Sequence, residues 1–445
     1  MNVFFIKSGE SLSMTRLLFI ILWMAVLIPG STYAQIAVSN TNSASVLAQK
    51  LVGPGVYISN PSILCNGNQS GLFTVTSSNL GVDSGIVLTT GVAASVGLVN
   101  GVNGLQSAFA NANQGTGGDA DLTALAGTST FDRCVLEFDL KADGDSIVFK
   151  YIFGSEEYPA FNCSNYNDVF GFFISGPGYP SPQNIALVPG TAIPVAINSV
   201  NNGVISAGGN LSNCTAMGSG SPFTGYYVDN TGGTSVTYDG FTQLFTARAG
   251  IQKCSTYHLK LAIADGFDHI FDSGVFLQAG SLQSNHVDLS IQTDSLSAGV
   301  PMVFEACDSA IVKIHRHLVQ TSVTTDTVQL LISGTSTNGV DYPLIASTYI
   351  FSNSVSDTLR TIYIEPFNDL ITEGTETLKL VLVDKCLTPV DSITIEINDP
   401  PKFTLTNNDT LICRGQSVSS NGVFDNGLVF SWSPTSGVAN PNSFF

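Results

Sequence analysis

Carboxylate side chains crowd two short stretches of this sequence, residues 151–178 and 261–277. Each stretch lies where one run of β-branched and aromatic residues ends and the next begins. Carboxylate oxygens are the ligands of hard cations such as calcium, which takes six to eight oxygens. The two stretches therefore predict a calcium site on a β scaffold. The candidate ligands are Glu156, Glu157, Asp168, Asp265 and Asp272.

Two other interpretations of Glu156 and Glu157 stay open. Neighbouring strand residues point to opposite faces, so both reach one site only if the chain has turned, which Pro159 favours. In the first alternative, the two carboxylates accept hydrogen bonds from backbone N–H groups and support a loop. In the second, an exported polysaccharide hydrolase uses them, because glycosidases need two carboxylates about 5 to 10 Å apart. The chain has only two Trp residues, so we expect neither a sugar-binding aromatic groove nor an enzyme.

Common motifs of nucleophilic and nucleotide chemistry are missing. There is no Gly-x-Ser-x-Gly, no P-loop and no dinucleotide-binding fingerprint. Asp143-Gly-Asp-Ser-Ile resembles a nucleophile signature, but a hairpin turn between two strands explains it better. The five histidines show no zinc-like spacing, and we expect His315 and His317, two apart on a strand, on the solvated surface. The sequence therefore predicts no catalytic residues.

The overall charge limits the classes of partner. The formal net charge is −18 at pH 7. Nucleic acid is not an expected partner, because a phosphate backbone is bound by clustered Lys and Arg. Only 11% of the residues are charged, while Gly, Ser, Thr and Asn are abundant, and this composition is typical of secreted β proteins.

Residues 1–34 predict a signal peptide. Lys7 and Arg16 precede the apolar run 17–28, and small residues follow it up to Ala34. The run is shorter than the roughly 20 residues of a membrane-spanning helix. We therefore expect the chain to be secreted or displayed on the cell's outer surface, with no membrane span once the signal peptide is removed.

Eight cysteines in an exported chain indicate disulfides, because an oxidising compartment preserves them. The sequence alone does not determine their connectivity. If pairing stays within domains, Cys65 and Cys413 are left without partners. The pairs that we expect are Cys163 with Cys214, Cys134 with Cys254, and Cys307 with Cys386.

The pattern of apolar runs predicts an all-β protein of tandem antiparallel β-sandwich domains, the first a larger, jelly-roll-like sandwich with long loops. Most runs in residues 36–284 are apolar on both faces, which indicates strands that are covered on both sides. The predicted strands are 85–90, 134–140, 146–153, 168–175, 257–264 and 274–279, and a short helix is predicted at 119–126. The Gly- and Asn-rich connection 199–237 suits a binding face built from loops.

A second domain is predicted at residues 286–399, where apolar and polar residues alternate as in antiparallel sandwich strands. The clearest alternation lies at 361–365, 377–383 and 392–397. Pro400 and Pro401 end the pattern, and a third domain begins at Lys402. Residues 402–445 are too few for an independent sandwich, so we expect this domain to be incomplete and the chain to be truncated.

Five segments within residues 36–284 resemble the choice-of-anchor L domain of exported bacterial surface proteins. They are, in order, FDRCVLEFDL, YIFGSEEYPAFNCSNYNDVFGFFISGPG, NIALVPGTAIPVAINSVNNG, YYVDNTGGTSVTYDGFT and YHLKLAIADGFDHIFDSGVFLQAGSL. The resemblance implies a location at the cell surface and no particular activity.

Residues 286–399 resemble a Calx-beta domain, through an acidic residue after an apolar strand, STNGVDY, PFNDLITEGTETLKLVLV and a closing IND. In calcium-binding members the acidic residues gather at one tip of the sandwich. The acidic residues at these positions are Glu305, Asp341, Asp369, Glu373, Glu376 and Asp399, and the resemblance implies as ligands Glu305, Asp341, Asp369, Glu373 and Asp399. This chain departs from strong binders, because two prolines follow Asp399 where they carry aspartates, and this implies weak binding or a structural spacer.

Residues 402–445 resemble the opening of an immunoglobulin-like or PKD-type repeat of gliding-motility-associated proteins of the Bacteroidetes. Such chains usually finish with a type IX secretion sorting domain. The expected function is therefore that of a secreted or cell-surface binding or adhesion-type protein, stabilised by calcium, whose partner is an extracellular glycan or surface protein. The alternatives are the hydrolase that uses Glu156 or Glu157, and an inert surface stalk.

Overall fold

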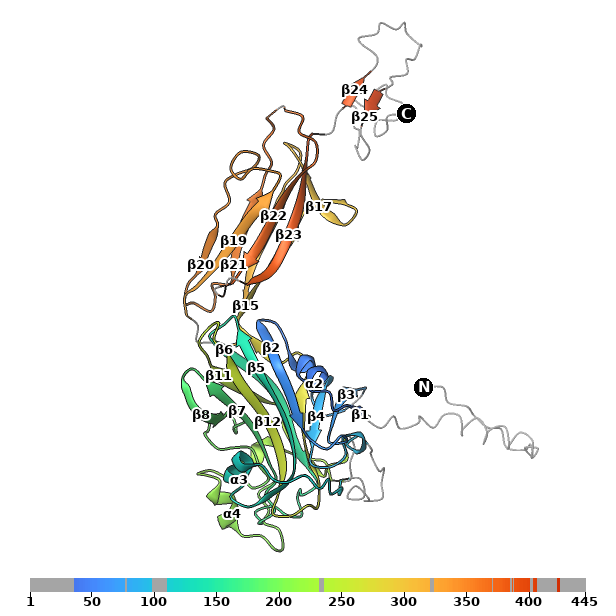
Figure 1. Ribbon diagram of the computed structural model, residues 1–445, viewed down its shortest axis with the longest axis vertical. Coiled ribbons are helices and arrows are strands. Elements are labelled where there is room, and N and C mark those ends of the chain that lie inside the picture. The colour runs from blue at the N-terminus through green and yellow to red at the C-terminus, as the bar shows by residue number, and fades with distance from the viewer. Residues whose placement is uncertain are drawn as a thin grey trace, which may run out of the picture.

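The computed structural model describes residues 36–400 except 77, 98–109, 232–235, 321–323, 370, 385 and 387, together with 403–405 and 422–424. The proposed signal peptide, Cys413 and most of the proposed third domain lie outside the described residues. The described chain is mostly strand and forms two sandwiches stacked end to end (Figure 1). The expected all-β architecture is confirmed.

Two sheets form the first sandwich. The larger has the order β1-β3-β4-β13-β6-β10-β9, and β11 and β14 also pair with β6. Its strands are β1 (Ile36–Asn40), β3 (Ser70–Val75), β4 (Ser84–Thr89), β6 (Ser146–Ser155), β9 (Tyr227–Asp229), β10 (Gly240–Thr242), β11 (Phe245–Gly250), β13 (Ser273–Gln278) and β14 (Gln283–Ser284). The smaller has the order β2-β5-β12-β7-β8. Its strands are β2 (Val56–Leu64), β5 (Thr130–Ala142), β7 (Val169–Gly176), β8 (Tyr179–Asn184) and β12 (Tyr257–Gly266).

The second sandwich has sheets of order β15-β18-β21 and β16-β17-β23-β22-β19-β20. Their strands are β15 (His286–Gln292), β16 (Ser295–Ser297), β17 (Val300–Phe304), β18 (Ala310–His317), β19 (Asp326–Gly334), β20 (Thr348–Phe351), β21 (Leu359–Ile364), β22 (Glu376–Val383) and β23 (Pro389–Asn398). Among the described strands, the pairing of β17 with β23 is parallel and the others are antiparallel. Beyond this sandwich, β24 (Phe403–Leu405) pairs with β25 (Gly422–Phe424).

The helices are short: α2 (Ala44–Leu51), α3 (Ala120–Ala126), α4 (Leu211–Ala216) and the 3-10 turns η1 (Ala93–Ser95) and η3 (Thr224–Tyr226). Helix α3 was predicted, and it begins where Asp119 accepts hydrogen bonds from two backbone N–H groups and ends at Gly127 with φ 72°. Helices α2 and α4 were not predicted. Because α2 has only eight residues, its buried positions do not repeat often enough to establish a helical period.

Apolar side chains cover both faces of the first sandwich's sheets. The main core lies between the sheets and includes Phe138, Phe149, Phe153, Phe170, Phe172, Leu259 and Leu261. On the outer face of the smaller sheet, Leu122 of α3 packs with Phe173. On the outer face of the larger sheet, Val236 and Tyr238 pack with Phe276. The two-sided coverage is therefore as expected, but a helix and a loop supply part of it.

The turn that contains Asp143 is not a hairpin, which corrects the prediction. It joins β5 to β6, and these strands belong to different sheets of the first sandwich. Ser146, the serine of the Asp143-Gly-Asp-Ser-Ile motif, is only 2% exposed and begins β6. The turn therefore passes the chain from one sheet to the other.

Three disulfides form among the described cysteines. Cys163 pairs with Cys214, as expected. The other two predicted pairs are wrong: Cys65 pairs with Cys134, and Cys254 pairs with Cys386 across the two domains, while Cys307 is exposed and free. Strand register and strand direction explain these pairings. Leu64 lies opposite Val135, which places the neighbouring cysteines side by side. Cys386 follows the end of β22 that faces the first domain, whereas Cys307 follows β17 at the opposite end of the sandwich.

The disulfide between Cys254 and Cys386 closes a loop with a sequence separation of 132. We expect its removal, by serine at both positions, to loosen the joint between the domains without unfolding either one, because each sandwich retains its own core. Limited proteolysis should then cut between the domains several-fold faster. The matched control is Cys307→Ser, which removes a free thiol. Equal cleavage rates for the double variant and the wild type would contradict the expectation.

Candidate metal sites

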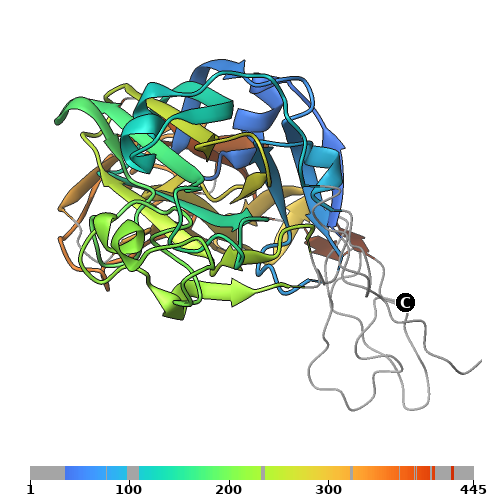
Figure 2. The same cartoon turned by 90° about the horizontal axis from the view of Figure 1, so that it is seen from below.

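The five predicted ligands of the first domain come together at one end of the sandwich. Glu156 and Glu157 follow β6, Asp168 precedes β7, Asp265 lies in β12 and Asp272 precedes β13. This end lies away from the second domain, and Figure 2 looks onto its covering loops. The exposed fractions of these side chains are 6%, 1%, 1%, 1% and 2%, respectively. We call these residues the buried acidic group.

Hydrogen bonds satisfy only part of the buried acidic group. Asp168 accepts hydrogen bonds from the Gly266 N–H (2.9 Å) and the Ser273 hydroxyl (2.6 Å). The Ala112 N–H lies 3.1 Å from both oxygens of Asp272. By contrast, the buried oxygens without a hydrogen-bond partner are Glu156 Oε2, Glu157 Oε2, and Asp265 Oδ1 and Oδ2. The Lys and Arg ion pairs of the described chain all lie elsewhere.

Burial and neighbouring carboxylates raise every pKa in this group. The pKa rises to about 9 for Glu156, about 11 for Glu157, and about 7 for Asp168 and Asp272, and that of Asp265 lies well above its ordinary value. Burial is the largest cause in each case. The five side chains therefore cannot all be ionised at neutral pH unless a cation joins them.

The spacing of these oxygens differs from that of a compact metal site. Among the described residues, groups of three ligand atoms within 4.8 Å of one another form in the second domain and at the joint between the domains. The buried acidic group forms no such triplet in the described chain. Calcium binding by these five residues stays a prediction.

The second domain carries compact carboxylate groups at the end remote from the first domain. Here, Glu305 follows β17, Asp341 lies between β19 and β20, Asp369 and Glu373 lie between β21 and β22, and Glu376 begins β22. One group comprises Glu305, Asp369 and Glu373, and the other comprises Asp341, Glu373 and Glu376. Glu373 is common to both. We call these five residues the tip site.

The tip site contains a buried, unsatisfied carboxylate. Glu305 is 5% exposed, and its Oε2 has no hydrogen-bond partner. Burial, followed by the nearby Asp369 and Asp399, raises the pKa of Glu305. Asp399, a predicted ligand, lies in neither group and instead accepts hydrogen bonds from the N–H groups of Glu373 (3.0 Å) and Gly374 (3.3 Å). It therefore supports the loop that presents Glu373.

A mixed group of His286, Asp288 and His317 was not predicted. Strands β15 and β18 pair His286 with His317, whose rings stack with centroids 4.6 Å apart. His317 Nε2 lies 3.0 Å from Asp288 Oδ2 and the side chain is 48% exposed, so its expected place on the surface is correct. His315 is only partly exposed and its Nε2 lies 2.7 Å from the Ser290 hydroxyl. The group depends on strand register, which the sequence pattern did not reveal.

Fold and sites together define a tandem β-sandwich protein with acidic loop ends. The model of the choice-of-anchor L domain family matches residues 35–283. This chain belongs to that family, which makes it a surface or secreted protein. No relative is found among the curated proteins. No helix in the described part of the chain is long and apolar enough to cross a membrane.

Solved structures show only distant similarity. The apo form of the Calx CBD1 domain is 22% identical, with a TM-score of 0.20, over 26% of this chain and 97% of that chain. The calcium-binding domain CBD12 of CALX1.1 is 21% identical, with a TM-score of 0.19, over 26% and 44%. A GH2 β-galacturonidase from Eisenbergiella tayi bound to galacturonate is 7% identical, with a TM-score of 0.17, over 63% and 37%. These TM-scores are too low to assign any property of those proteins to this chain.

Proposed function

We propose that this protein acts outside the cell as a binding or adhesion-type protein and that its second domain takes up calcium at the tip site. The observation that carries the proposal is the pair of carboxylate triplets that share Glu373. Calcium prefers oxygen ligands and tolerates irregular geometry, so loop carboxylates suit it better than they suit a transition metal.

Calcium at the tip site would stabilise three loops at once. The connections β17–β18, β19–β20 and β21–β22 and the first residue of β22 supply its carboxylates, which repel one another when no cation lies between them. Because Glu305 is buried, this repulsion is costly. A bound ion therefore gives this end of the molecule a defined shape for recognition.

An extracellular glycan or surface protein is the proposed partner. At the loop end of the first domain, Phe267 and Ile270 are 48% and 46% exposed, and Tyr166 packs edge-on to Phe267 with a centroid distance of 5.2 Å. Exposed aromatic and aliphatic side chains on loops favour a binding surface over an inert stalk.

Binding is favoured over polysaccharide hydrolysis. Glu156 and Glu157 are only 6% and 1% exposed. A general acid or nucleophile must reach within hydrogen-bond distance of the glycosidic bond, and a polymer chain cannot approach buried side chains in this conformation. We therefore assign the two residues to the interior of the first domain.

Calcium titration of the tip-site variant Glu373→Gln tests the proposal. The substitution removes the carboxylate common to both groups, so we expect calcium affinity at this site to fall at least tenfold, or about 1.4 kcal/mol. Calorimetry and the calcium-dependent shift in melting temperature provide the measurement. Glu396→Gln, in β23 and outside both groups, is the matched control. Identical calcium binding by Glu373→Gln and the wild type would refute the proposal.

A further inference from the structure

The joint between the two sandwiches brings carboxylates of both domains face to face. Asp143 lies in the β5–β6 turn of the first domain, and Asp384 directly follows β22 of the second. An oxygen of each and Cys386 Sγ all lie within 4.8 Å of one another. Cys386 is bonded to Cys254, so its sulfur is not a thiolate that binds a metal. The two carboxylates are therefore the candidate ligands.

Asp145, two residues from Asp143, is a carboxylate at this joint whose two oxygens both accept hydrogen bonds. Its Oδ1 accepts hydrogen bonds from the amides of Asn285 (2.9 Å) and Gln320 (3.1 Å), and its Oδ2 accepts one from the Thr324 hydroxyl (2.9 Å). These donors satisfy both oxygens across the domain boundary.

Asp143 and Asp384 differ from Asp145 because each keeps an unsatisfied oxygen. Asp384 Oδ1 accepts a hydrogen bond from the Thr388 N–H at 2.9 Å. Asp384 Oδ2 and Asp143 Oδ1 are buried and have no hydrogen-bond partner, and Asp384 is only 5% exposed. One oxygen of Asp143 and one of Asp384 lie within 4.8 Å of each other, so the two ionised side chains repel each other unless a proton or a cation lies between them.

Lys253 lies near Asp143 and acts to lower its pKa, but its ion pair is with another carboxylate. Lys253 Nζ lies 2.8 Å from Asp326 Oδ1. His286 also faces the joint, but burial lowers its pKa and keeps its ring neutral at neutral pH. Burial, followed by Asp384, raises the pKa of Asp143 to about 7. In the described part of the chain, neither Asp143 nor Asp384 forms an ion pair with a Lys or Arg side chain.

A small cavity lies at this place. Its volume is about 10 Å³, and its polar lining includes Asp143, Asn285, His286, Asp326 and Asp384. This volume is about that of one water-sized occupant. The cavity therefore has room for a single ion between the two domains.

We propose that this cavity binds one hard divalent cation of the calcium class, held by the carboxylates of Asp143 and Asp384, with water completing its coordination. Oxygen ligands and charge favour such a cation. The site is separate from the tip site, because Glu376 and Asp384 flank opposite ends of β22. The ion ties the β5–β6 turn of the first domain to the β22–β23 turn of the second, and it reinforces the disulfide beside it.

Equilibrium dialysis with calcium on the full chain tests the site. Asp384→Asn retains the oxygen that accepts from Thr388 and removes one negative charge, so we expect a folded variant that binds one calcium ion fewer per chain, or binds it at least tenfold more weakly. Asp143→Asn, on the other domain, should show the same loss. Glu373→Gln should still bind the ion at the joint. Loss of calcium binding at the tip site and loss of calcium binding at the joint are therefore distinguishable.

Terbium, as a calcium substitute, locates the ion. Tyr57 lies close enough to Asp143 for the Asp143 charge to help raise its pKa, and a tyrosine beside the ion transfers excitation to terbium. In the Glu373→Gln background, Tyr57→Phe or Asp384→Asn should remove most of the tyrosine-sensitised emission. The proposal is overturned if Asp384→Asn binds as much calcium as the wild type. It is equally overturned if only the pH dependence of melting changes, because the two carboxylates would then share a proton and no metal.

Discussion

Raising the pH of a metal-free solution from about 5 to about 8 is expected to lower the melting temperature of the first domain by roughly 10 °C. Asp272 accounts for much of this effect, because burial raises its pKa from 3.8 to about 7 in the folded chain. A proton bound to it stabilises the fold fully below the unfolded pKa. This stabilisation is lost as the pH rises through the folded pKa, at a cost of about 3 kcal/mol for Asp272 alone.

Asp272→Asn provides the decisive comparison. The amide oxygen still accepts from the Ala112 N–H but carries no charge, so the variant should melt higher than the wild type at pH 8 and show a shallower pH dependence. Asp83→Asn, at an exposed position, should follow the wild-type curve. Melting temperatures that stay constant or rise between pH 5 and pH 8 would contradict the expectation.

The same pH titration, repeated with calcium, distinguishes stabilisation of the buried acidic group by bound protons from stabilisation by bound calcium. If calcium restores the melting temperature at pH 8 in a chain that carries both Glu373→Gln and Asp384→Asn, the ion acts at neither the tip site nor the joint. Glu156, Glu157 and Asp265 then become its prime ligands, because all three have buried oxygens without partners. If calcium has no effect in that chain, protons alone stabilise the group.

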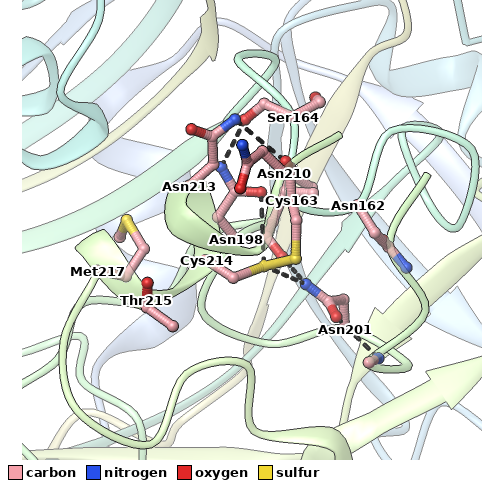
Figure 3. Close-up of a disulfide and its surroundings, with 12 residues drawn as sticks. Asn162, Cys163, Ser164, Asn198, Asn201, Asn210, Asn213, Cys214, Thr215 and Met217 are labelled. Carbon is pink, nitrogen blue, oxygen red and sulfur yellow. Dashed lines mark hydrogen bonds between the residues drawn. A yellow bond between two sulfur atoms is a disulfide. The ribbon is translucent and has the colours of Figure 1, made fainter. Parts of the chain in front are cut away.

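Replacing both Cys163 and Cys214 by serine is expected to lower the free energy of unfolding by about 4 kcal/mol. The disulfide closes a loop with a sequence separation of 51 and connects the β6–β7 loop to α4 (Figure 3). Loss of the link frees the unfolded chain, which is the entropic source of the destabilisation in this estimate. Urea denaturation followed by circular dichroism measures it.

Asparagine side chains surround this disulfide and depend on its position. Asn213 donates to the Cys163 carbonyl at 3.1 Å, and Asn198 donates to the Ser164 carbonyl at 2.8 Å (Figure 3). Both amides bind the loop that also carries Glu157, so the double variant should expose this loop to proteases. Cys307→Ser serves as the control and should change the free energy of unfolding by less than about 0.5 kcal/mol. A double variant as stable as that control would contradict the expectation.

Local sequence pattern predicted six of the fourteen described strands of the first domain: β4, β5, β6, β7, β12 and β13. The predicted strand 146–153 corresponds to β6 (Ser146–Ser155), and 257–264 corresponds to β12 (Tyr257–Gly266). Dense β-branched and aromatic residues carry this information because their strand preference acts over a few neighbouring positions. Strands that contain proline, such as β8 (Tyr179–Asn184), lack such a run and were not predicted.

The proximity of acidic side chains could be predicted where the chain itself keeps the residues near one another. Asp369, Glu373 and Glu376 lie within one loop and the first residue of the following strand, so their proximity needs little tertiary information. Their closeness to Glu305 was implied only by the Calx-beta resemblance. Asp399, which the resemblance implies as a ligand, accepts hydrogen bonds from the loop backbone, and its role as a ligand stays a prediction.

The sequence by itself determined the strand-rich character of this protein, its strong negative charge and the loops where carboxylates collect. Only the tertiary structure decided that Cys254 bonds to Cys386, that His286 stacks on His317, and that Asp143 meets Asp384. The physical reason is distance along the chain. Composition and periodicity report on residues that are close in the sequence. These contacts instead depend on strand register and on how two domains, each with its own hydrophobic core, pack against each other.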